Sequence, residues 1–305
     1  MKYFCAQPAT LYYAWQVEVM LYNFERRGID LQDVNIVCCI QNEIPEEWIK
    51  LRDGYDANFY FYQDRRRSKQ YISSIRPNIL KQHFALYPDL EHQTIFYHDC
   101  DIIFSHILPT AQFKVNDVWY GSDTNSYISY DYIISKGQDV FDKMVEVVGI
   151  DPQIVIDNNA HSIGAQYIMK NIDAQFWHDV QMDSENLYIE ISQLNQQKKY
   201  ENPEYHELQI WCADMWAVLW NGWKRGHVTR CHDDLNFSWA TSSKTDFFNN
   251  KIFHNAGITA EHTDKFFKAK YMNSLPYNLN LELVDNSASK QYYEWIKKVE
   301  KVTVL

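Results

Sequence analysis

The first third of the chain alternates short apolar runs with segments that have helical apolar spacing. Four apolar runs predict strands, at residues 2–6, 34–40, 58–62 and 94–104. Three segments predict helices, at residues 12–27, 48–51 and 72–87, and Gly28 ends the first of them. Such βαβ alternation is typical of parallel strands joined by right-handed crossovers. We therefore expect an α/β protein with a mostly parallel central sheet flanked by helices.

The second half of the chain is less regular. We expect strands at residues 118–121 and 130–135, helices at 138–148, 166–180 and 210–223, and an exposed polar loop at 194–207. The last of these helices is expected to break at Gly222 and Gly226. No internal repeat and no clear boundary separates the two parts. A single domain over residues 1–305 is the expectation.

Composition narrows the class of protein. With 46% hydrophobic residues among 305, the chain can bury a large core. Its net charge of −11 argues against nonspecific adhesion to nucleic acid or anionic membranes. Six cysteines without a CxxC pair are typical of reduced core residues. The chain shows neither a signal peptide nor an apolar stretch of ~18 residues, the length of a membrane span. This predicts a cytoplasmic protein without a membrane partner.

Two carboxylates one residue apart carry the clearest chemical signal. Asp99 and Asp101 interrupt the apolar run at 94–104, and in an extended chain they would point to the same side. Carboxylates in this arrangement suit Mg²⁺ or Mn²⁺ bound together with nucleotide phosphates. An Asx-rich turn would explain the same spacing. The apolar neighbours favour the cation, because buried carboxylates need a cation or hydrogen-bond donors.

Four further residues are candidates for a functional role, and two of them, His254 and Asp214, also have a structural interpretation. His254 follows an apolar run and is either a core histidine or a metal ligand. Asp214 heads a tryptophan-rich helix, as its N-cap or as a carboxylate tuned for catalysis. Gly164 permits close backbone approach to a ligand, and Lys268, among aromatic residues, is within reach of a diphosphate in the functional interpretation.

Taken in order, these features resemble the GT-A nucleotide-sugar glycosyltransferases, which have a Rossmann-like fold. His98-Asp99-Cys100-Asp101 is similar to their Asp-X-Asp metal motif. The nearer resemblance is to the hydroxyproline O-arabinosyltransferase and peptidyl-serine galactosyltransferase group. Residues 164–168 are similar to its Gly-X-X-Tyr-Ile element, and residues 211–215 to its Trp-X-X-Glu-Met element, with Asp214 for the glutamate. The resemblance covers residues 2–276.

The resemblance implies a site and an activity. Mn²⁺ or Mg²⁺ would be bound by Asp99, Asp101 and His254, against the diphosphate of a nucleotide-sugar donor, a UDP-linked sugar. Other residues would bind the donor, namely Gln7, Pro8, Arg76, Gly164 and Lys268. Asp214 would act in transfer, as a base or by stabilising an oxocarbenium-like state, and Gln166 is the next catalytic candidate. The resemblance favours a retaining reaction.

The resemblance also implies how the domain is divided. Residues 1–110 would form a nucleotide-binding half, residues 111–280 an acceptor-side half, and residues 281–305 a C-terminal helix. The enzymes of the hydroxyproline O-arabinosyltransferase and peptidyl-serine galactosyltransferase group are plant enzymes, which carry membrane anchors and act in the secretory pathway. Because this chain shows neither an anchor nor a signal peptide, the protein acceptors of those enzymes are not carried over to it.

The acceptor and the activity have alternatives. The acceptor would be a glycan, a protein or a modified DNA base, such as a hydroxymethyl pyrimidine of a phage, for which the basic run at residues 65–69 is the one sequence support. The same run is explained by a solvated loop. A phosphohydrolase or nucleotidyltransferase would also use paired aspartates, but usually adds further acidic ligands, and none stands in clear register. Donor turnover would distinguish an enzyme from a noncatalytic sugar-binding module.

Overall fold

Three parallel strands joined by helices open the chain, as the sequence predicts. The computed structural model describes residues 1–305. The strands are β1 (Lys2–Pro8), β2 (Val34–Ile40) and β3 (Asn58–Gln63), and the connecting helices are α1 (Leu11–Arg26) and α2 (Glu46–Gly54). β1 pairs with β2, and β2 pairs with β3, in parallel. β2 is buried at every residue except Ile40, which accounts for its continuous apolar run.

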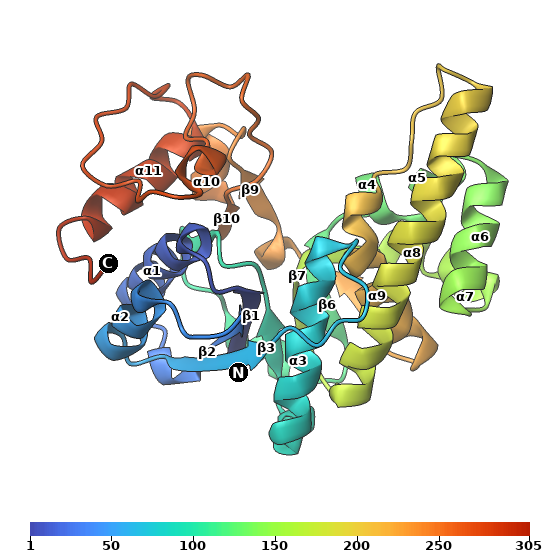
Figure 1. Ribbon diagram of the computed structural model, residues 1–305, viewed down its shortest axis with the longest axis horizontal. Coiled ribbons are helices and arrows are strands. Elements are labelled where there is room, and N and C mark those ends of the chain that lie inside the picture. Colours follow the sequence, from blue (N-terminus) through green and yellow to red (C-terminus); the bar gives the residue numbers. More distant parts are fainter. The chain divides into compact units, whose positions relative to one another are not determined.

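The chain divides into two compact units. Unit 1 consists of Met1–Gln63, Tyr97–Gln112 and Asp233–Leu305, so its N-terminal and C-terminal residues fold together. Its second sheet has the order β5-β10-β9, formed by β5 (Ile102–Phe104), β9 (Phe237–Trp239) and β10 (Ile252–His254). The helices α10 (Lys244–Asn249) and α11 (Ala288–Val299), orange and red in Figure 1, pack beside this sheet. Trp15, Phe253 and Tyr292 belong to one buried core cluster that joins α1, β10 and α11.

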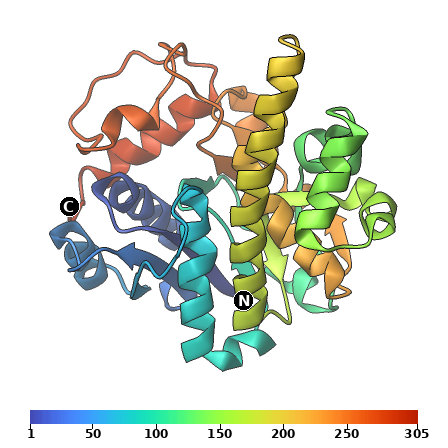
Figure 2. The same ribbon diagram turned by 45° about the vertical axis from the view of Figure 1, so that its right-hand side comes forward.

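Unit 2 consists of Asp64–Phe96 and Phe113–His232. Its strands β6 (Trp119–Asp123) and β7 (Ile163–Met169) are antiparallel, and β8 (Thr229–Cys231) pairs with β6 in parallel. Its helices are α3 (Ile75–Leu86), α4 (Asn125–Ile128), α5 (Tyr130–Ile134), α6 (Gln138–Val148), α7 (Pro152–Asp157), α8 (Ala174–Glu201) and α9 (Ala213–Lys224). The long helix α8 packs against α3 and α9 (Figures 1 and 2). No helix of the protein combines the length and the apolar character needed to cross a membrane.

The largest sheet has seven strands in the order β3-β2-β1-β4-β7-β6-β8, where β4 is Ile95–Tyr97. The pairings within the N-terminal strands are parallel, and β7 is antiparallel to β6. Helices flank the strands in both units. The expected α/β class, with a mostly parallel central sheet, is confirmed.

Two of the expected strands are wrong. The run at residues 94–104 is not one strand, because β4 ends at Tyr97 and β5 begins at Ile102, with a turn over residues 98–101. β5 belongs to the other sheet and pairs antiparallel with β10. The expected strand at 130–135 is the helix α5, which begins because the Ser129 side chain accepts a hydrogen bond from the Tyr132 N–H.

Three expectations about helices are also wrong. The expected helix at 166–180 is two elements, the strand β7 and then α8, whose N-cap Asp173 accepts a hydrogen bond from the Phe176 N–H. The expected loop at 194–207 is helical as far as Glu201, since glutamine and lysine are good helix formers and Lys198 and Lys199 lie at the favourable C-terminal end. Gly222 lies inside α9 and does not break it.

Gly222 is required by packing. A Cβ at this position would lie 2.7 Å from the ring of Trp119, which is fully buried. Alanine normally stabilises a helix interior relative to glycine by about 1 kcal/mol. Here we expect Gly222→Ala to lower the free energy of unfolding by about 1–2 kcal/mol, because overpacking a core outweighs that gain. Denaturant unfolding measures it.

A double-mutant cycle provides the control. Trp119→Phe removes the outer ring atoms that the new methyl group would meet. Gly222→Ala should therefore cost less in the Trp119→Phe background than in the wild type. Equal costs in both backgrounds would contradict the packing explanation.

Candidate functional site

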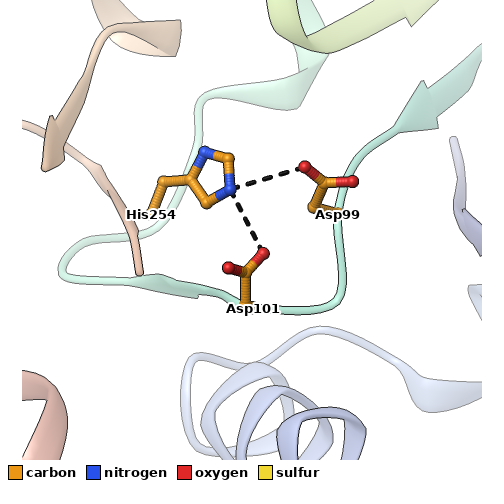
Figure 3. A group of neighbouring side chains, drawn as sticks. All are labelled: Asp99, Asp101 and His254. Atoms are coloured by element: carbon orange, nitrogen blue, oxygen red, sulfur yellow. Dashed lines mark ion pairs between the residues drawn. The ribbon is translucent and has the colours of Figure 1, made fainter. Parts of the chain in front are cut away.

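The paired aspartates and His254 lie together in unit 1 (Figure 3). The turn between β4 and β5 carries Asp99 and Asp101, and β10 ends at His254. The His254 Nε2 atom is 3.1 Å from Asp101 Oδ1 and 3.4 Å from Asp99 Oδ2. The antiparallel pairing of β10 with β5, which places His254 opposite Ile102, fixes this arrangement. The Asn255 N–H also donates a hydrogen bond of 2.9 Å to the Asp101 carbonyl.

Positive charge compensates the buried carboxylate of Asp101. The Lys268 ammonium donates a hydrogen bond to Asp101 Oδ2, while His254 faces Oδ1. Burial alone would raise the pKa of Asp101, but Lys268 and His254 outweigh it and hold that pKa well below the usual range. The carboxylate therefore stays ionised.

His254 is correspondingly basic. Burial lowers the pKa of its imidazole, but Asp101 and Asp99 outweigh burial and raise the pKa to about 9. Because the folded value lies above the ordinary 6.5, this interaction stabilises the protein fully below pH ~6.5. The stabilisation is lost as the pH rises through about 9.

His98 and Cys100, which flank Asp99, have structural roles. The ring Nδ1 of His98 hydrogen-bonds the Asp99 carbonyl at 2.8 Å, and burial lowers the pKa of His98 to about 4, so its ring is neutral. Burial also raises the pKa of the Cys100 thiol well above its ordinary value. Neither residue belongs to the group of possible ligand atoms.

The residues present fit a divalent metal ion. Ligand atoms of Asp99, Asp101 and His254 all lie within 4.8 Å of one another. Carboxylate oxygens suit Mg²⁺ and Mn²⁺. The additional imidazole nitrogen favours a transition metal such as Mn²⁺. In the structure, the cationic side chains of His254 and Lys268 face the carboxylate that a metal ion would neutralise.

Asp214 lies in a separate cluster in unit 2. It stands in the first turn of α9, where Cys212 is the N-cap, so the structural interpretation of Asp214 as the cap is wrong. The Tyr71 hydroxyl donates to Asp214 Oδ1 at 2.6 Å, and the Arg76 guanidinium is 3.5 Å from Oδ2. Burial and Asp214 raise the pKa of Tyr71, so its phenol stays a donor. Tyr71 carried no sequence signal and was missed.

The other predicted site residues have packing partners in the structure. Gln7 is buried on β1, and its amide donates a hydrogen bond to the Cys38 sulfur at 3.4 Å, while the neighbouring Pro8 is half-buried. Gln166 lies on β7 and donates to the Ser122 hydroxyl. Gly164 is buried, and a Cβ there would lie 2.5 Å from the Met215 methyl group. The ligand roles of these residues stay predictions.

Part of the basic run at residues 65–69 is not solvated. The Arg66 side chain is mostly buried and forms an ion pair with Asp64 at 3.0 Å. Arg66 Nη1 also donates to the Tyr71 carbonyl at 2.9 Å, and Lys69 lies 3.6 Å from Asp64. These internal pairs weaken the one sequence argument for a DNA acceptor.

Comparison with known proteins gives the fold. No protein-family model and no curated protein matches the chain. The solved apo structure of WbbM, a bifunctional glycosyltransferase, is similar with a TM-score of 0.51 at 9% identity, over 99% of this chain and 51% of WbbM. The galactosyltransferase LgtC, solved with donor and acceptor sugar analogues, has a TM-score of 0.43 at 12% identity over 96% of this chain and 94% of LgtC. Mouse xyloside xylosyltransferase 1 has a TM-score of 0.40 at 11% identity, over 85% of this chain and 100% of that one.

The WbbM likeness shows that the chain has a glycosyltransferase fold, and the predicted GT-A fold is confirmed. The chain spans about half the length of WbbM. The nearer resemblance to the hydroxyproline O-arabinosyltransferase and peptidyl-serine galactosyltransferase group stays a prediction.

The basicity of His254 predicts a pH dependence of metal binding. A metal ion must displace the His254 proton, so we expect the apparent Mn²⁺ affinity to rise about tenfold per pH unit from neutral pH to about 9. Calorimetric titration at several pH values, in buffers of different ionisation enthalpy, measures both the affinity and the proton release. His254→Asn should bind Mn²⁺ more weakly and release no proton. If Mn²⁺ binding by the wild type does not depend on pH, His254 is excluded as a ligand.

Proposed function

We propose that the chain is a metal-dependent glycosyltransferase, which moves a sugar from a nucleoside-diphosphate sugar, a UDP-linked one, to an acceptor. The observation that carries the proposal is the convergence of Asp99, Asp101 and His254 on a glycosyltransferase fold. A bound Mn²⁺ or Mg²⁺ would neutralise the charge that develops on the departing diphosphate. The three residues would hold this ion.

The residues that the resemblance implies as donor contacts would bind and orient the donor. In the absence of the ion, Lys268 neutralises Asp101. With Asp101 compensated by an ion, the Lys268 ammonium would be available to the donor phosphates, with Arg76 as a second candidate. Gln7, Pro8 and Gly164 are the remaining candidates for the donor contacts. We also propose that residues 1–110 form the nucleotide-binding half, with Gly164 and Lys268 contributing from outside that range, and that residues 111–280 form the acceptor side.

The cluster around Asp214 would act in transfer. Tyr71 and Arg76 hold its two carboxylate oxygens in place, which is the positioning that a catalytic carboxylate needs. Asp214 would accept the acceptor proton in an inverting reaction, or stabilise the oxocarbenium-like state in the retaining reaction that the resemblance favours. Gln166 is the second candidate for this role.

Donor binding is expected to require a divalent metal, because two carboxylates would otherwise repel a diphosphate. We expect calorimetric UDP affinity in Mn²⁺ to fall at least about tenfold in EDTA. Asp99→Asn and Asp101→Asn should lose this dependence. Asp264→Asn, at an aspartate paired with Lys265 outside the site, is the matched control and should behave as the wild type. Equal UDP affinity with Mn²⁺ and with EDTA would refute the metal role.

Transfer is expected to depend on Asp214. Asp214→Asn keeps the shape and removes the charge, so we expect normal folding and normal Mn²⁺-dependent UDP binding. Release of nucleoside diphosphate, measured in a screen of nucleotide sugars with candidate acceptors, should fall at least about 100-fold.

Asp179→Asn is the matched control for this prediction. Asp179 forms an ion pair with Arg225 at 2.9 Å in the same unit, so the variant also removes one carboxylate charge facing an arginine. It should leave transfer unchanged. Wild-type turnover in Asp214→Asn would remove Asp214 from the mechanism and leave Gln166 as the next candidate.

A further inference from the structure

Unit 2 contains a polar cavity that shares no residue with the metal site or the Asp214 cluster. Its volume is about 290 Å³. Three segments form its wall, residues 92–94 before β4, residues 114–117 before β6 and residues 170–171 after β7. Polar side chains dominate this wall, and Val115 is its one aliphatic residue.

Lys170 is the unusual member of this wall. Only 6% of the residue is exposed, and its ammonium nitrogen forms no hydrogen bond with any protein group. Its backbone is held in place, because the Trp119 indole N–H donates to the Lys170 carbonyl at 2.9 Å. The next residue, Asn171, has a φ of 54°, so the chain turns sharply at the cavity. The position of Lys170 is therefore fixed by the fold.

An unpaired buried ammonium is costly, and neighbouring residues relieve the cost only in part. Burial lowers the pKa of Lys170, and the carboxylate of Asp117 opposes that shift. No ion pair joins the two residues, and Asp117 is exposed on the cavity wall. Lys114, also exposed on this wall, adds a second positive charge. Two lysines face one aspartate, so the cavity carries an excess of positive charge.

We propose that this cavity binds the phosphate group of a small phosphorylated molecule, with Lys170 as the principal counter-ion. Lysine is a typical phosphate ligand, and the side chains of Thr94 and Asn171 in the same wall add a hydroxyl and an amide donor. The cavity volume lies near the lower limit of small-molecule sites, roughly 300–1,000 Å³, and so exceeds the needs of a bare ion. The site shares no residue with the metal ligands or the Asp214 cluster.

The test uses the melting temperature of the full chain as a function of inorganic phosphate, with sodium chloride holding the ionic strength constant. A ligand of the folded state raises the melting temperature in a saturable way. We expect such a rise in the wild type. Glucose 1-phosphate should act at least as strongly, because it fills more of the cavity, and acetate should act weakly.

Two variants locate the effect. Lys170→Met should weaken phosphate binding at least about tenfold, and should raise the melting temperature without phosphate because it removes a buried unpaired charge. Lys114→Met changes an exposed residue, tests the same cavity without altering the core, and should weaken binding several-fold. Lys143→Met, at a half-buried lysine paired with Glu146, is the matched control and should bind phosphate normally.

Lys268→Met separates this cavity from the metal site. Phosphate stabilisation that persists in Lys268→Met and is lost in Lys170→Met supports the proposal. The reverse result, or no saturable response in the wild type, overturns it. Acetate binding as strongly as phosphate would overturn the assignment to phosphate. None of these outcomes depends on sugar transfer.

Discussion

The compensation of the buried Asp101 carboxylate is the interaction on which unit 1 depends. A buried carboxylate without a cation or donors would be strongly destabilising. Its positive partners come from distant parts of the sequence, His254 at the end of β10 and Lys268 in the short 3₁₀ helix Lys268–Tyr271. The C-terminal residues must therefore fold against the turn between β4 and β5. The pairing of β5 with β10 in the second sheet and the shared core of α1 and α11 hold them in that place.

The same compensation links stability to ligand binding. The side chains of His254 and Lys268 neutralise Asp101 in the isolated protein, and a divalent ion would compete with both of them for the carboxylate. The charges that make the site stable without metal are thus the charges that a metal ion has to displace. In the proposed function, the Lys268 ammonium would then be attracted to the anionic donor instead of to Asp101.

The sequence predicted the elements whose pattern is local. β2 and α6 were predicted at their observed bounds, since the β-branched residues of the run at 34–40 favour a strand and the 3.6-residue period at 138–148 favours a helix. The predictions for the residues of α5 and β7 were wrong, because short apolar runs fit either a strand or a helix. The serine cap of α5 was also overlooked. An Asx-rich turn at Asp99 was one interpretation, but the division of the run at 94–104 into two strands was not predicted, because the apolar residues on both sides belong to strands of different sheets.

For the site, residue chemistry pointed to the paired aspartates, and the resemblance to the GT-A glycosyltransferases added His254. Asp99, Asp101 and His254 were predicted as one set, and the structure brings them together. The hydrogen bond between Lys268 and Asp101, and the contact of Tyr71 with Asp214, join residues far apart in sequence. Such pairings depend on how the chain folds back on itself. No spacing rule within a single sequence reports them.

Two buried charged side chains, Asp101 and Lys170, differ in whether a protein group already contacts their charge. Asp101 has a cationic partner on each carboxylate oxygen, so a ligand that binds there must replace an existing interaction. Lys170 has no hydrogen-bonded partner on its ammonium, so an anion that binds it breaks no existing hydrogen bond of that group. The first arrangement favours selectivity, because only a strongly binding ion displaces the lysine and the histidine proton. The second favours ready binding, because the free energy gained from the new ion pair is not offset by the loss of an old one.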